Sequence, residues 1–432
     1  MSSQPITLGP TTACHLCGVA GLTEFTDFHS FRRITSDCRP WPSGGRLCAC
    51  LNCGGVQKLV DESWNREVEE LYAGYAIYDQ AEGAEQAVFD QSSGEASSRS
   101  LRLLTALRDS IALPAQGRML DVGCGNGAML RTFGTALPGW SLAGTELGGK
   151  YRVLVENIPG VESLYTCPPA EVPGQFDLIT MIHVLEHIPQ PERFLARLLS
   201  KLVPGGLLVV ELPHHVANPF ELLIADHCTH FAAATAAALL ERAGLEILSV
   251  AEHWVPKELT LVARKRAAPA ESAGDAPGGL PDSIDTRPAI VQDCLRCVTQ
   301  RIGWLGQVSS TARKLAADRE IGLFGTSIAA TWLFAELEGA VGFFVDEDPH
   351  RIGKSWQGRP VYDPPRIPPG SCLLIPLPVA LAESIARRIA RPDLEICLPP
   401  AAQFTSNSVS TGDDSGGASR TCRCPGSDQA AG

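Results

Sequence analysis

The middle of the chain alternates short apolar runs with stretches of helical periodicity. One apolar run ends in Asp121 and leads into a loop that contains Gly123, Gly125 and Gly127. A helix is predicted to begin at Ala128, directly after the last of these glycines. Strands that alternate with helices are typical of α/β domains with a parallel sheet. The pattern therefore predicts a strand, a glycine-rich turn and a helix N-terminus at this place.

Further apolar runs extend the predicted sheet. Strands are expected at 140–146, 175–182 and 206–212, and a helix is expected to run from 191 to 202. The carboxyl ends of parallel strands form the rim where open α/β sheets bind their ligands. Functional residues are therefore expected directly after these strands.

The glycine loop is a candidate site for a nucleotide. Glycines let the backbone turn sharply and approach a ligand closely, and the following helix presents free N–H groups. Gly123, Gly125 and Ala128 match the relaxed Gly-x-Gly-x-x-Ala fingerprint of sites that bind a dinucleotide such as NAD or FAD. Asp121 before the loop and Glu146 after the second strand suit the cationic S-adenosylmethionine better than a pyrophosphate. Glu146 is also placed to bind the ribose hydroxyls of an adenosine.

Composition is that of a globular protein and narrows the range of partners. The chain has 432 residues, of which 44% are hydrophobic and 19% charged, enough for two or three domains with packed cores. A net charge of −12 without a basic stripe argues against a nucleic-acid partner. We find no apolar stretch of membrane-spanning length and no signal-peptide pattern, so we expect a cytoplasmic protein without a membrane partner.

Four of the fifteen cysteines form two C-x-x-C pairs near the N-terminus. The pairs are Cys14 with Cys17 and Cys50 with Cys53, and glycine follows both. Two such pairs complete a closed tetrahedral thiolate shell, so we predict a structural Zn²⁺ site with these four ligands. Cys48 is close enough in sequence to replace Cys50.

Residues 61–112 are predicted to be mostly helical and carry three tyrosines at helical spacing. Tyr72, Tyr75 and Tyr78 fall roughly on one face of such a helix. Two interpretations fit this spacing. The tyrosines pack against the neighbouring domain, or their hydroxyls line a pocket for the methyl acceptor.

Histidines gather in the second half of the predicted sheet. His183 and His187 follow the strand at 175–182, and His227 and His230 lie in a later cluster. Histidine is the side chain most easily tuned to move protons near neutral pH, so these residues are candidate general bases. A second metal site made of Asp226, His227 and His230 is the rival interpretation, and hydrogen-bonded structural histidines are a third.

The glycine loop, Glu146, the strand that begins at Phe176 and the Leu-Val-Pro-Gly-Gly sequence at 202–206 resemble, as a set, the class I S-adenosylmethionine-dependent methyltransferases. The resemblance covers about residues 113–266. It implies that S-adenosylmethionine is bound by Asp121, Gly123, Gly125, Gly127 and Glu146.

Together with the cysteine pairs, the chain resembles the zinc-containing nucleotide-sugar C-methyltransferases over about residues 14–400. Those enzymes carry a Tyr-x-x-Tyr before the core, which Tyr75 and Tyr78 match. They also carry an Asn-Val-Leu-x-His after the fourth strand, matched by the sequence that ends at His187, with His183 in place of the asparagine.

Their Tyr-His-Glu-His-Phe loop, whose last histidine is the proposed base, is matched here only by His230 and Phe231. The resemblance implies a small-molecule acceptor, a nucleotide-linked keto sugar, from which His230 or, as second choice, His187 removes a proton to give an enolate. Tyr75 and Tyr78 are then expected at the acceptor. Methyl transfer to oxygen or nitrogen of a glycan or metabolite is the first alternative, and a non-catalytic binding protein with a methyltransferase-like core is the second.

The C-terminal part has a strand pattern of its own. Apolar runs that begin at Ile321 and Val341 follow a helical stretch at 286–315 and imply a second Rossmann-like α/β domain. The predicted fold class is therefore α/β, with a Rossmann-like methyltransferase core between two other parts. The predicted parts are a zinc-binding module at 1–60, a helical tyrosine-bearing segment at 61–112, the core at 113–266, a linker at 267–285, the C-terminal domain at 286–400 and a disordered tail at 401–432.

Overall fold

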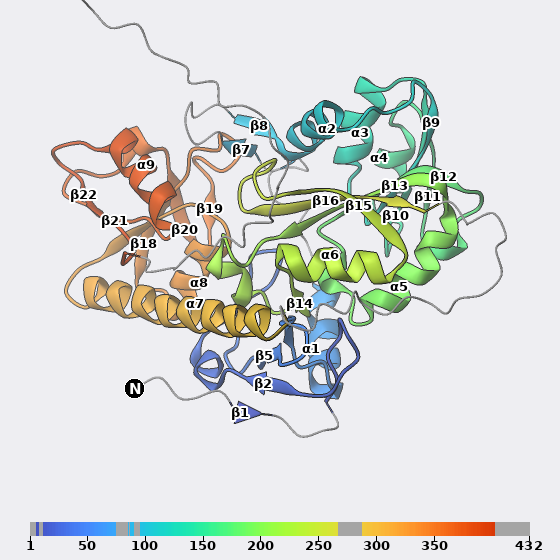
Figure 1. The fold of residues 1–432 in the computed structure, drawn as a ribbon. Coiled ribbons are helices and arrows are strands. Elements are labelled where there is room, and N and C mark those ends of the chain that lie inside the picture. Colours follow the sequence, from blue (N-terminus) through green and yellow to red (C-terminus); the bar gives the residue numbers. More distant parts are fainter. Residues whose placement is uncertain are drawn as a thin grey trace, which may run out of the picture.

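The computed structural model describes residues 6–7, 12–74, 85, 87–89, 96–266 and 287–401. These residues form an N-terminal module, a central sheet domain and a C-terminal sheet domain, which are blue, cyan to yellow, and orange in Figure 1. The predicted linker and the predicted tail beyond residue 401 fall outside the described residues. No helix in the described part of the chain is both long enough and apolar enough to cross a membrane.

The central domain is built on a seven-stranded sheet with the order β11-β10-β9-β12-β13-β16-β15. Its strands are β9 (Gly117–Val122), β10 (Trp140–Thr145), β11 (Val161–Tyr165), β12 (Phe176–Ile182), β13 (Leu202–Pro213), β15 (Leu245–Ala251) and β16 (Glu258–Lys265). The first five are parallel, and β16 is antiparallel to both of its neighbours. The predicted strands are confirmed, although β13 starts earlier than expected because the preceding helix ends at Leu198.

The strand order reverses at β9. β10 and β11 lie on one side of it, and β12 and β13 lie on the other. The carboxyl ends of β9 and β12 therefore flank the topological switch point, the place where open α/β sheets bind ligands. The glycine loop and His183 both lie there.

Helices cover both faces of this sheet. They are α2 (Arg99–Ser110), α3 (Ala128–Ala136), α4 (Arg152–Glu156), α5 (Pro191–Leu198) and α6 (Ala233–Arg242). Met119 and Leu178 pack with α2 and α3, whereas Leu120 and Ile179 pack with α5 and α6. Successive residues of a strand point to opposite faces, so a sheet covered on both sides has strands that are apolar throughout. Each such buried side chain contributes about 1.5–3 kcal/mol to stability.

The N-terminal module is a five-stranded sheet with the order β1-β2-β5-β6-β14. Its strands are β1 (Ile6–Thr7), β2 (Leu22–Glu24), β5 (Leu47–Cys50), β6 (Val56–Lys58) and β14 (Thr229–His230), and a separate pair is β3 (Arg33–Ile34) with β4 (Pro40–Trp41). The last strand of the sheet belongs to the central domain in sequence, and its His230 pairs with Val56. The segment that carries His227 and His230 is thus held by a sheet of the N-terminal module.

The described residues of the segment between module and core are mostly helical. They include α1 (Glu62–Ala73) and α2, and an antiparallel strand pair of β7 (Ala87–Phe89) and β8 (Ala96–Ser98) lies between them in sequence. Helix α1 begins where the Asp61 side chain accepts a hydrogen bond from the Trp64 N–H at 2.9 Å. An N-cap of this kind satisfies a backbone donor at the helix start.

The C-terminal domain has a six-stranded sheet with the order β19-β20-β18-β17-β21-β22. The strands are β17 (Ile321–Phe324), β18 (Val341–Val345), β19 (Ser355–Trp356), β20 (Arg359–Tyr362), β21 (Cys372–Leu374) and β22 (Glu395–Cys397), and the helices are α8 (Ile328–Glu336) and α9 (Val379–Ile389). Apart from β19 the strands are parallel, and α8 and α9 connect successive strands as in a Rossmann-like α/β arrangement.

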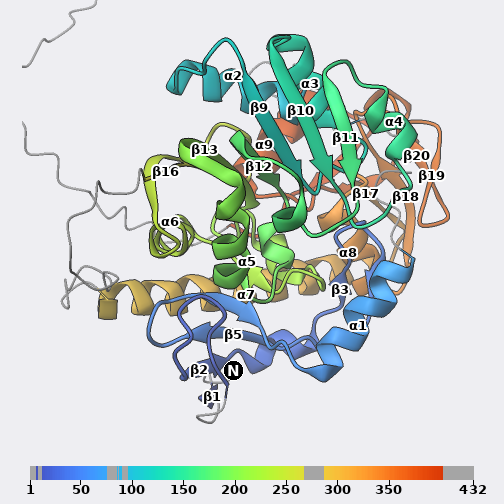
Figure 2. The ribbon, with the colours of Figure 1, turned by 90° about the vertical axis from the view of Figure 1, so that its right-hand side faces the viewer.

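The long helix α7 (Arg287–Ala316) joins all three parts, as Figures 1 and 2 show. Cys294 Sγ donates to the Gly54 carbonyl of the N-terminal module at 2.8 Å. Arg301 Nε donates to the His215 carbonyl of the central domain at 3.1 Å. Trp304 Nε1 donates to the Pro400 carbonyl at 2.9 Å. The three parts are therefore packed around one helix.

Candidate active site

The glycine loop after β9 has a backbone that only glycine adopts easily. Gly123, Gly125 and Gly127 have φ angles of 71°, 53° and 81°, all in the left-handed region. A Cβ atom on Gly123 would lie 2.6 Å from Cγ2 of Val184. A larger residue at position 123 would therefore clash with Val184. The same short distance shows that the loop lies directly against the segment that follows β12.

Glu146 holds the loop from the end of β10. Its Oε2 accepts a hydrogen bond from the Gly125 N–H at 2.9 Å, and its Oε1 accepts one from the Leu147 N–H at 2.8 Å. A carboxylate that occupies a loop N–H disfavours a pyrophosphate at the same place, because both groups are anionic. The arrangement fits S-adenosylmethionine, which is cationic, better than it fits a dinucleotide.

Asp121 is a buried carboxyl beneath the same loop. Its Oδ1 accepts a hydrogen bond from Thr180 Oγ1 at 2.6 Å. Burial raises the pKa of Asp121 to about 7, although the hydrogen bond from Thr180 acts in the opposite direction. A positively charged group bound nearby would favour the ionised form, which is the second feature that fits S-adenosylmethionine.

His183 lies at the carboxyl end of β12, beside the glycine loop. Its φ of 55° is unusual for a residue other than glycine. Its backbone N–H donates to the Glu211 backbone carbonyl at 3.0 Å. Its side chain is 28% exposed, and its Nε2 lies 3.1 Å from Glu258 Oε2. Burial lowers the pKa of His183, and the nearby Glu258 carboxylate acts against this shift. The lowered pKa favours the neutral imidazole, which is the form that can accept a proton.

Two carboxylates and one arginine from a helix and two other strands surround His183. Glu211 at the end of β13 and Glu258 at the start of β16 lie 3.5 Å and 3.2 Å from the guanidinium of Arg99. Burial raises the pKa of Glu211 to about 8. For Glu258 burial acts in the same direction, but the charges of His183 and Arg99 outweigh it and lower its pKa. Sequence reasoning missed these three residues; Glu211, at a strand end, is the one that the rim rule could have found.

His187 lies one turn further along, in the short 3₁₀ helix η4 (Leu185–His187). Its Nδ1 lies 3.1 Å from the Asp226 carbonyl oxygen and 3.1 Å from the Tyr72 hydroxyl. Burial lowers the pKa of His187 to about 4. Of the three tyrosines singled out in the sequence, Tyr72 therefore reaches the histidines, whereas Tyr75 and Tyr78 lie outside the described residues.

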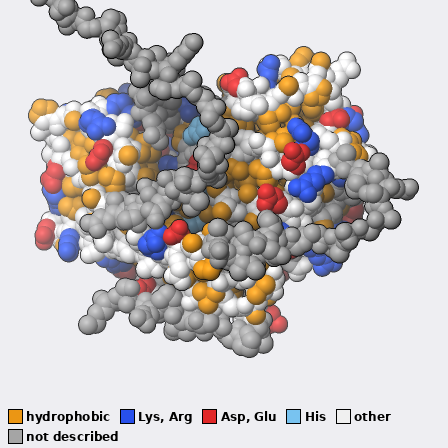
Figure 3. Space-filling model, in the orientation of Figure 1, with side chains coloured by type: hydrophobic (Ala, Val, Ile, Leu, Met, Phe, Trp, Pro, Cys, Tyr) orange, Lys and Arg blue, Asp and Glu red, His pale blue; other side chains and the backbone are white. Residues whose placement is uncertain are grey.

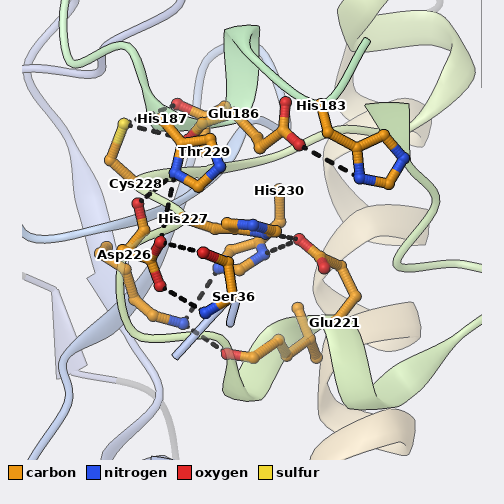
Figure 4. A network of polar contacts seen from close by, with 12 residues as sticks. Ser36, His183, Glu186, His187, Glu221, Asp226, His227, Cys228, Thr229 and His230 are labelled. Carbon is orange, nitrogen blue, oxygen red and sulfur yellow. Dashed lines mark hydrogen bonds and ion pairs between the residues drawn. The ribbon is translucent and has the colours of Figure 1, made fainter. Parts of the chain in front are cut away.

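His227 and His230 converge on one carboxylate, as Figure 4 shows. Their Nδ1 atoms lie 2.7 Å and 3.1 Å from Oε1 of Glu221, in the 3₁₀ helix η6 (Pro219–Leu223). Nε2 of His230 lies 3.0 Å from Nζ of Lys58, and the His230 side chain is fully buried. Both ring nitrogens of His230 are thus in contact with other side chains.

Asp226 does not join His227 and His230 in a common ligand set. Its Oδ1 accepts from the Ser36 N–H at 2.9 Å, and its Oδ2 accepts from the Ser36 hydroxyl at 2.5 Å. The rival metal site predicted from the sequence is therefore not the one that the geometry brings together.

The four predicted zinc ligands gather in the N-terminal module. One sulfur atom from each of Cys14, Cys17, Cys50 and Cys53 lies within 4.8 Å of the others. Leu16 N–H and Gly55 N–H donate to the sulfurs of Cys14 and Cys53, both at 3.4 Å. The cluster contains Cys50 rather than Cys48. Four converging thiols have the number and type of ligands that a structural Zn²⁺ takes.

Comparisons with known proteins find similarity to methyltransferases. Residues 95–250 match a family model described as a methyltransferase domain. A ubiquinone biosynthesis O-methyltransferase of Chromobacterium violaceum is 35% identical over 125 residues, which are 27% of this chain and 53% of that protein. The corresponding protein of Burkholderia pseudomallei is 27% identical over 33% of this chain and 72% of its own length.

Among solved structures, a 1,6-didemethyltoxoflavin-N1-methyltransferase of Burkholderia thailandensis with bound S-adenosylhomocysteine is 18% identical. The match covers 49% of this chain and 96% of that one, with a TM-score of 0.34. This chain spans about half the length of the first curated relative that it matches. The curated relatives named above match about a third of this chain or less.

Proposed function

Because residues 95–250 form a class I S-adenosylmethionine-dependent methyltransferase domain, we propose that this chain transfers a methyl group to the carbon beside a ketone in a small-molecule acceptor, a nucleotide-linked keto sugar. The observation that carries the proposal is the place of His183. It lies at the switch point of the sheet, next to the glycine loop, with one ring nitrogen facing Glu258.

His183 is the base in this proposal, in preference to His230 or His187. A non-glycine residue in the left-handed region costs about 1–3 kcal/mol, and such strain is retained where the surrounding structure has a use for it. Nε2 of His183 faces Glu258 at 3.1 Å. Nδ1 lies 3.9 Å from Glu186 Oε1, which is beyond hydrogen-bond distance, so Nδ1 is the atom that takes a proton from the acceptor in this proposal. Both nitrogens of His230 are engaged, so His230 is a positioning residue here.

The chain's own residues hold the reactants and move the proton. When bound, S-adenosylmethionine supplies an electrophilic methyl group. His183 takes the proton from the carbon beside the ketone, and the electron pair of that C–H bond gives an enolate. The enolate carbon bonds to the methyl group as the methyl–sulfur bond breaks and sulfur keeps its electron pair. The proton on His183 then passes to water. Near-attack geometry at the rim supplies most of the rate acceleration.

Solvent exchange without methyl donor tests the enolate step. With the chain and a nucleotide-linked keto sugar in D₂O, deuterium should appear at the carbon beside the ketone. The same sugar without protein provides the background rate. Methyl transfer by a chain that never catalyses this exchange would contradict the enolate mechanism.

Methyl transfer to oxygen is the second candidate, and one observation favours it. The relatives that are 35% and 27% identical are named as O-methyltransferases of ubiquinone biosynthesis. An acceptor hydroxyl also needs a base, so His183 serves either reaction. The two differ in the exchange experiment, because an oxygen acceptor predicts no deuterium on carbon.

The acceptor in this proposal is a small molecule rather than a nucleic acid or a membrane. The net charge is −12, and on the face in Figure 3 basic and acidic side chains are interspersed. Nucleic-acid and membrane surfaces bind clustered basic residues. This pattern supports the smaller acceptor.

We also propose that the four gathered thiols hold a structural Zn²⁺. The closed set of four sulfurs leaves no open position for a substrate. Thiolate ligands persist in a reducing compartment, so a cytoplasmic location is part of this proposal.

A further inference from the structure

A second group of metal-binding side chains lies at the rim of the central sheet. One ligand atom from each of Glu186, His187 and His227 lies within 4.8 Å of the other two. Glu186 and His187 come from η4 after β12, and His227 comes from the loop before β14. Figure 4 shows these three side chains between His183 and Asp226. Segments far apart in the sequence thus place two imidazoles and a carboxylate at one point.

The Nδ1 atom of each imidazole in this group is already occupied. Nδ1 of His187 faces the Asp226 carbonyl at 3.1 Å, and Nδ1 of His227 faces Glu221 Oε1 at 2.7 Å. Histidines that bind metals donate the other ring N–H to a carbonyl or carboxylate in this way, which fixes the ring and its tautomer. The arrangement leaves Nε2 of both rings as the ligand atom.

Glu186 supplies the observation that points to a bound cation. Its side chain is 1% exposed, and within the described part of the chain neither carboxylate oxygen has a hydrogen-bond partner. Its nearest ion-pair contact is His183 Nδ1 at 3.9 Å. A buried carboxylate without a partner is costly, and a cation between it and the two imidazoles removes that cost.

We propose that Glu186, His187 and His227 bind a divalent first-row transition-metal ion such as Zn²⁺, Mn²⁺ or Fe²⁺. Two imidazoles and one carboxylate are a ligand set that these ions take at sites with open positions. An open position accepts an oxygen of a substrate. On the basis of the proposed function, that oxygen is the ketone or enolate oxygen of the acceptor, whose charge the metal stabilises while His183 takes the neighbouring proton.

This site differs from the one that the sequence suggested. Both oxygens of Asp226 are bonded by Ser36, and both nitrogens of His230 face Glu221 and Lys58. The potential ligand atoms of both residues are therefore already in contact with other polar groups. Only His227 belongs to both sets, and the carboxylate ligand of the proposed site is Glu186 instead of Asp226.

Metal content of the full chain, measured without methyl donor or acceptor, tests the site directly. The metal-free chain is reloaded with Zn²⁺ alone, freed of loosely bound ion, and analysed by mass spectrometry of the metal. We expect two ions per chain for the natural sequence and one for Glu186→Gln, His187→Gln or His227→Gln. Cys17→Ser should lose the other ion. His230→Gln, which changes a neighbour that offers no ligand atom, should retain both.

Reloading with Co²⁺ provides a second readout that separates the two sites. Thiolate ligands give an intense near-ultraviolet charge-transfer band, whereas a site of imidazoles and carboxylate gives only weak visible bands. The weak bands should disappear in Glu186→Gln and the charge-transfer band should persist, which also shows that the variant is folded. A natural chain that holds no ion beyond the cysteine site, or three ligand variants that keep its full metal content, would overturn the proposal. Metal content is measured without methyl donor or acceptor and does not depend on any turnover, so either proposal can fail alone.

Discussion

At the scale of single residues, the proposed chemistry depends on His183. Replacing it with glutamine keeps a polar side chain of similar reach but removes the proton acceptor. We expect kcat to fall by about 10²–10⁴-fold, the usual contribution of a general base, while binding of S-adenosylmethionine is unchanged. Steady-state kinetics and calorimetric titration of the methyl donor measure the two quantities.

His350→Gln is the matched control, because this histidine is exposed on the C-terminal domain. It should leave kcat unchanged. Full turnover by the His183→Gln variant would remove His183 from the mechanism.

Asp121 predicts a pH dependence of methyl-donor binding. Burial raises its pKa to about 7, so the carboxyl is mostly protonated at pH 6 and mostly ionised at pH 8. The ionised form attracts a cationic ligand. Affinity for S-adenosylmethionine should therefore rise about tenfold between these pH values, with release of a proton on binding. Calorimetry in buffers of different ionisation enthalpy measures both effects, and Asp121→Asn should show neither.

At the scale of elements, the glycine loop and the segment after β12 act as one unit. Gly123→Ala would place a Cβ atom 2.6 Å from Val184 in a backbone with a φ of 71°. We expect a loss of about 1–3 kcal/mol of stability and at least a tenfold weaker binding of S-adenosylmethionine. Thermal unfolding and calorimetry measure these changes.

Gly148→Ala provides the control for this substitution. A Cβ atom on Gly148 would have no heavy atom within 4 Å, apart from its own chain neighbours, and the residue lacks a positive φ. Equal effects of the two substitutions would mean that the contact between the loop and Val184 is unimportant for binding.

The elements also show what sequence patterns can and cannot predict. The strand that ends at Asp121 and the glycine turn were predictable, because alternation, strand length and glycine spacing are local properties. The group around His183 was not predictable in full. Arg99, Glu211 and Glu258 come from α2, β13 and β16, and only the tertiary fold brings them together. Pairing of His230 with Val56 joins distant segments in the same way.

At the scale of the whole molecule, the N-terminal module with its four cysteines holds the segment that carries His227 and His230. β14 is an edge strand of the module's sheet, and the Lys58 N–H donates to the Cys228 carbonyl at 2.9 Å. Loss of the proposed Zn²⁺ from the cysteines should loosen this sheet. We expect faster hydrogen exchange at 56–58 and 228–230, and lower methyl transfer, whereas the amides of β9 stay protected.

Hydrogen exchange followed by mass spectrometry, on Cys17→Ser beside the natural sequence, checks this coupling. The comparison with β9 is the internal control, because its neighbours in the sheet are β10 and β12. Unchanged exchange at 228–230 in the variant would show that the module does not stabilise the cluster.

The central claim is methyl transfer from S-adenosylmethionine to a carbon beside a ketone. The most direct test incubates the full chain with S-adenosylmethionine labelled in its methyl group and a panel of nucleotide-linked keto sugars, and examines the products by mass spectrometry and carbon NMR. We predict a product heavier by one labelled methyl group, with that methyl bonded to the carbon next to the ketone. A labelled methyl found on oxygen or nitrogen, or no labelled product from any keto sugar, would contradict the account.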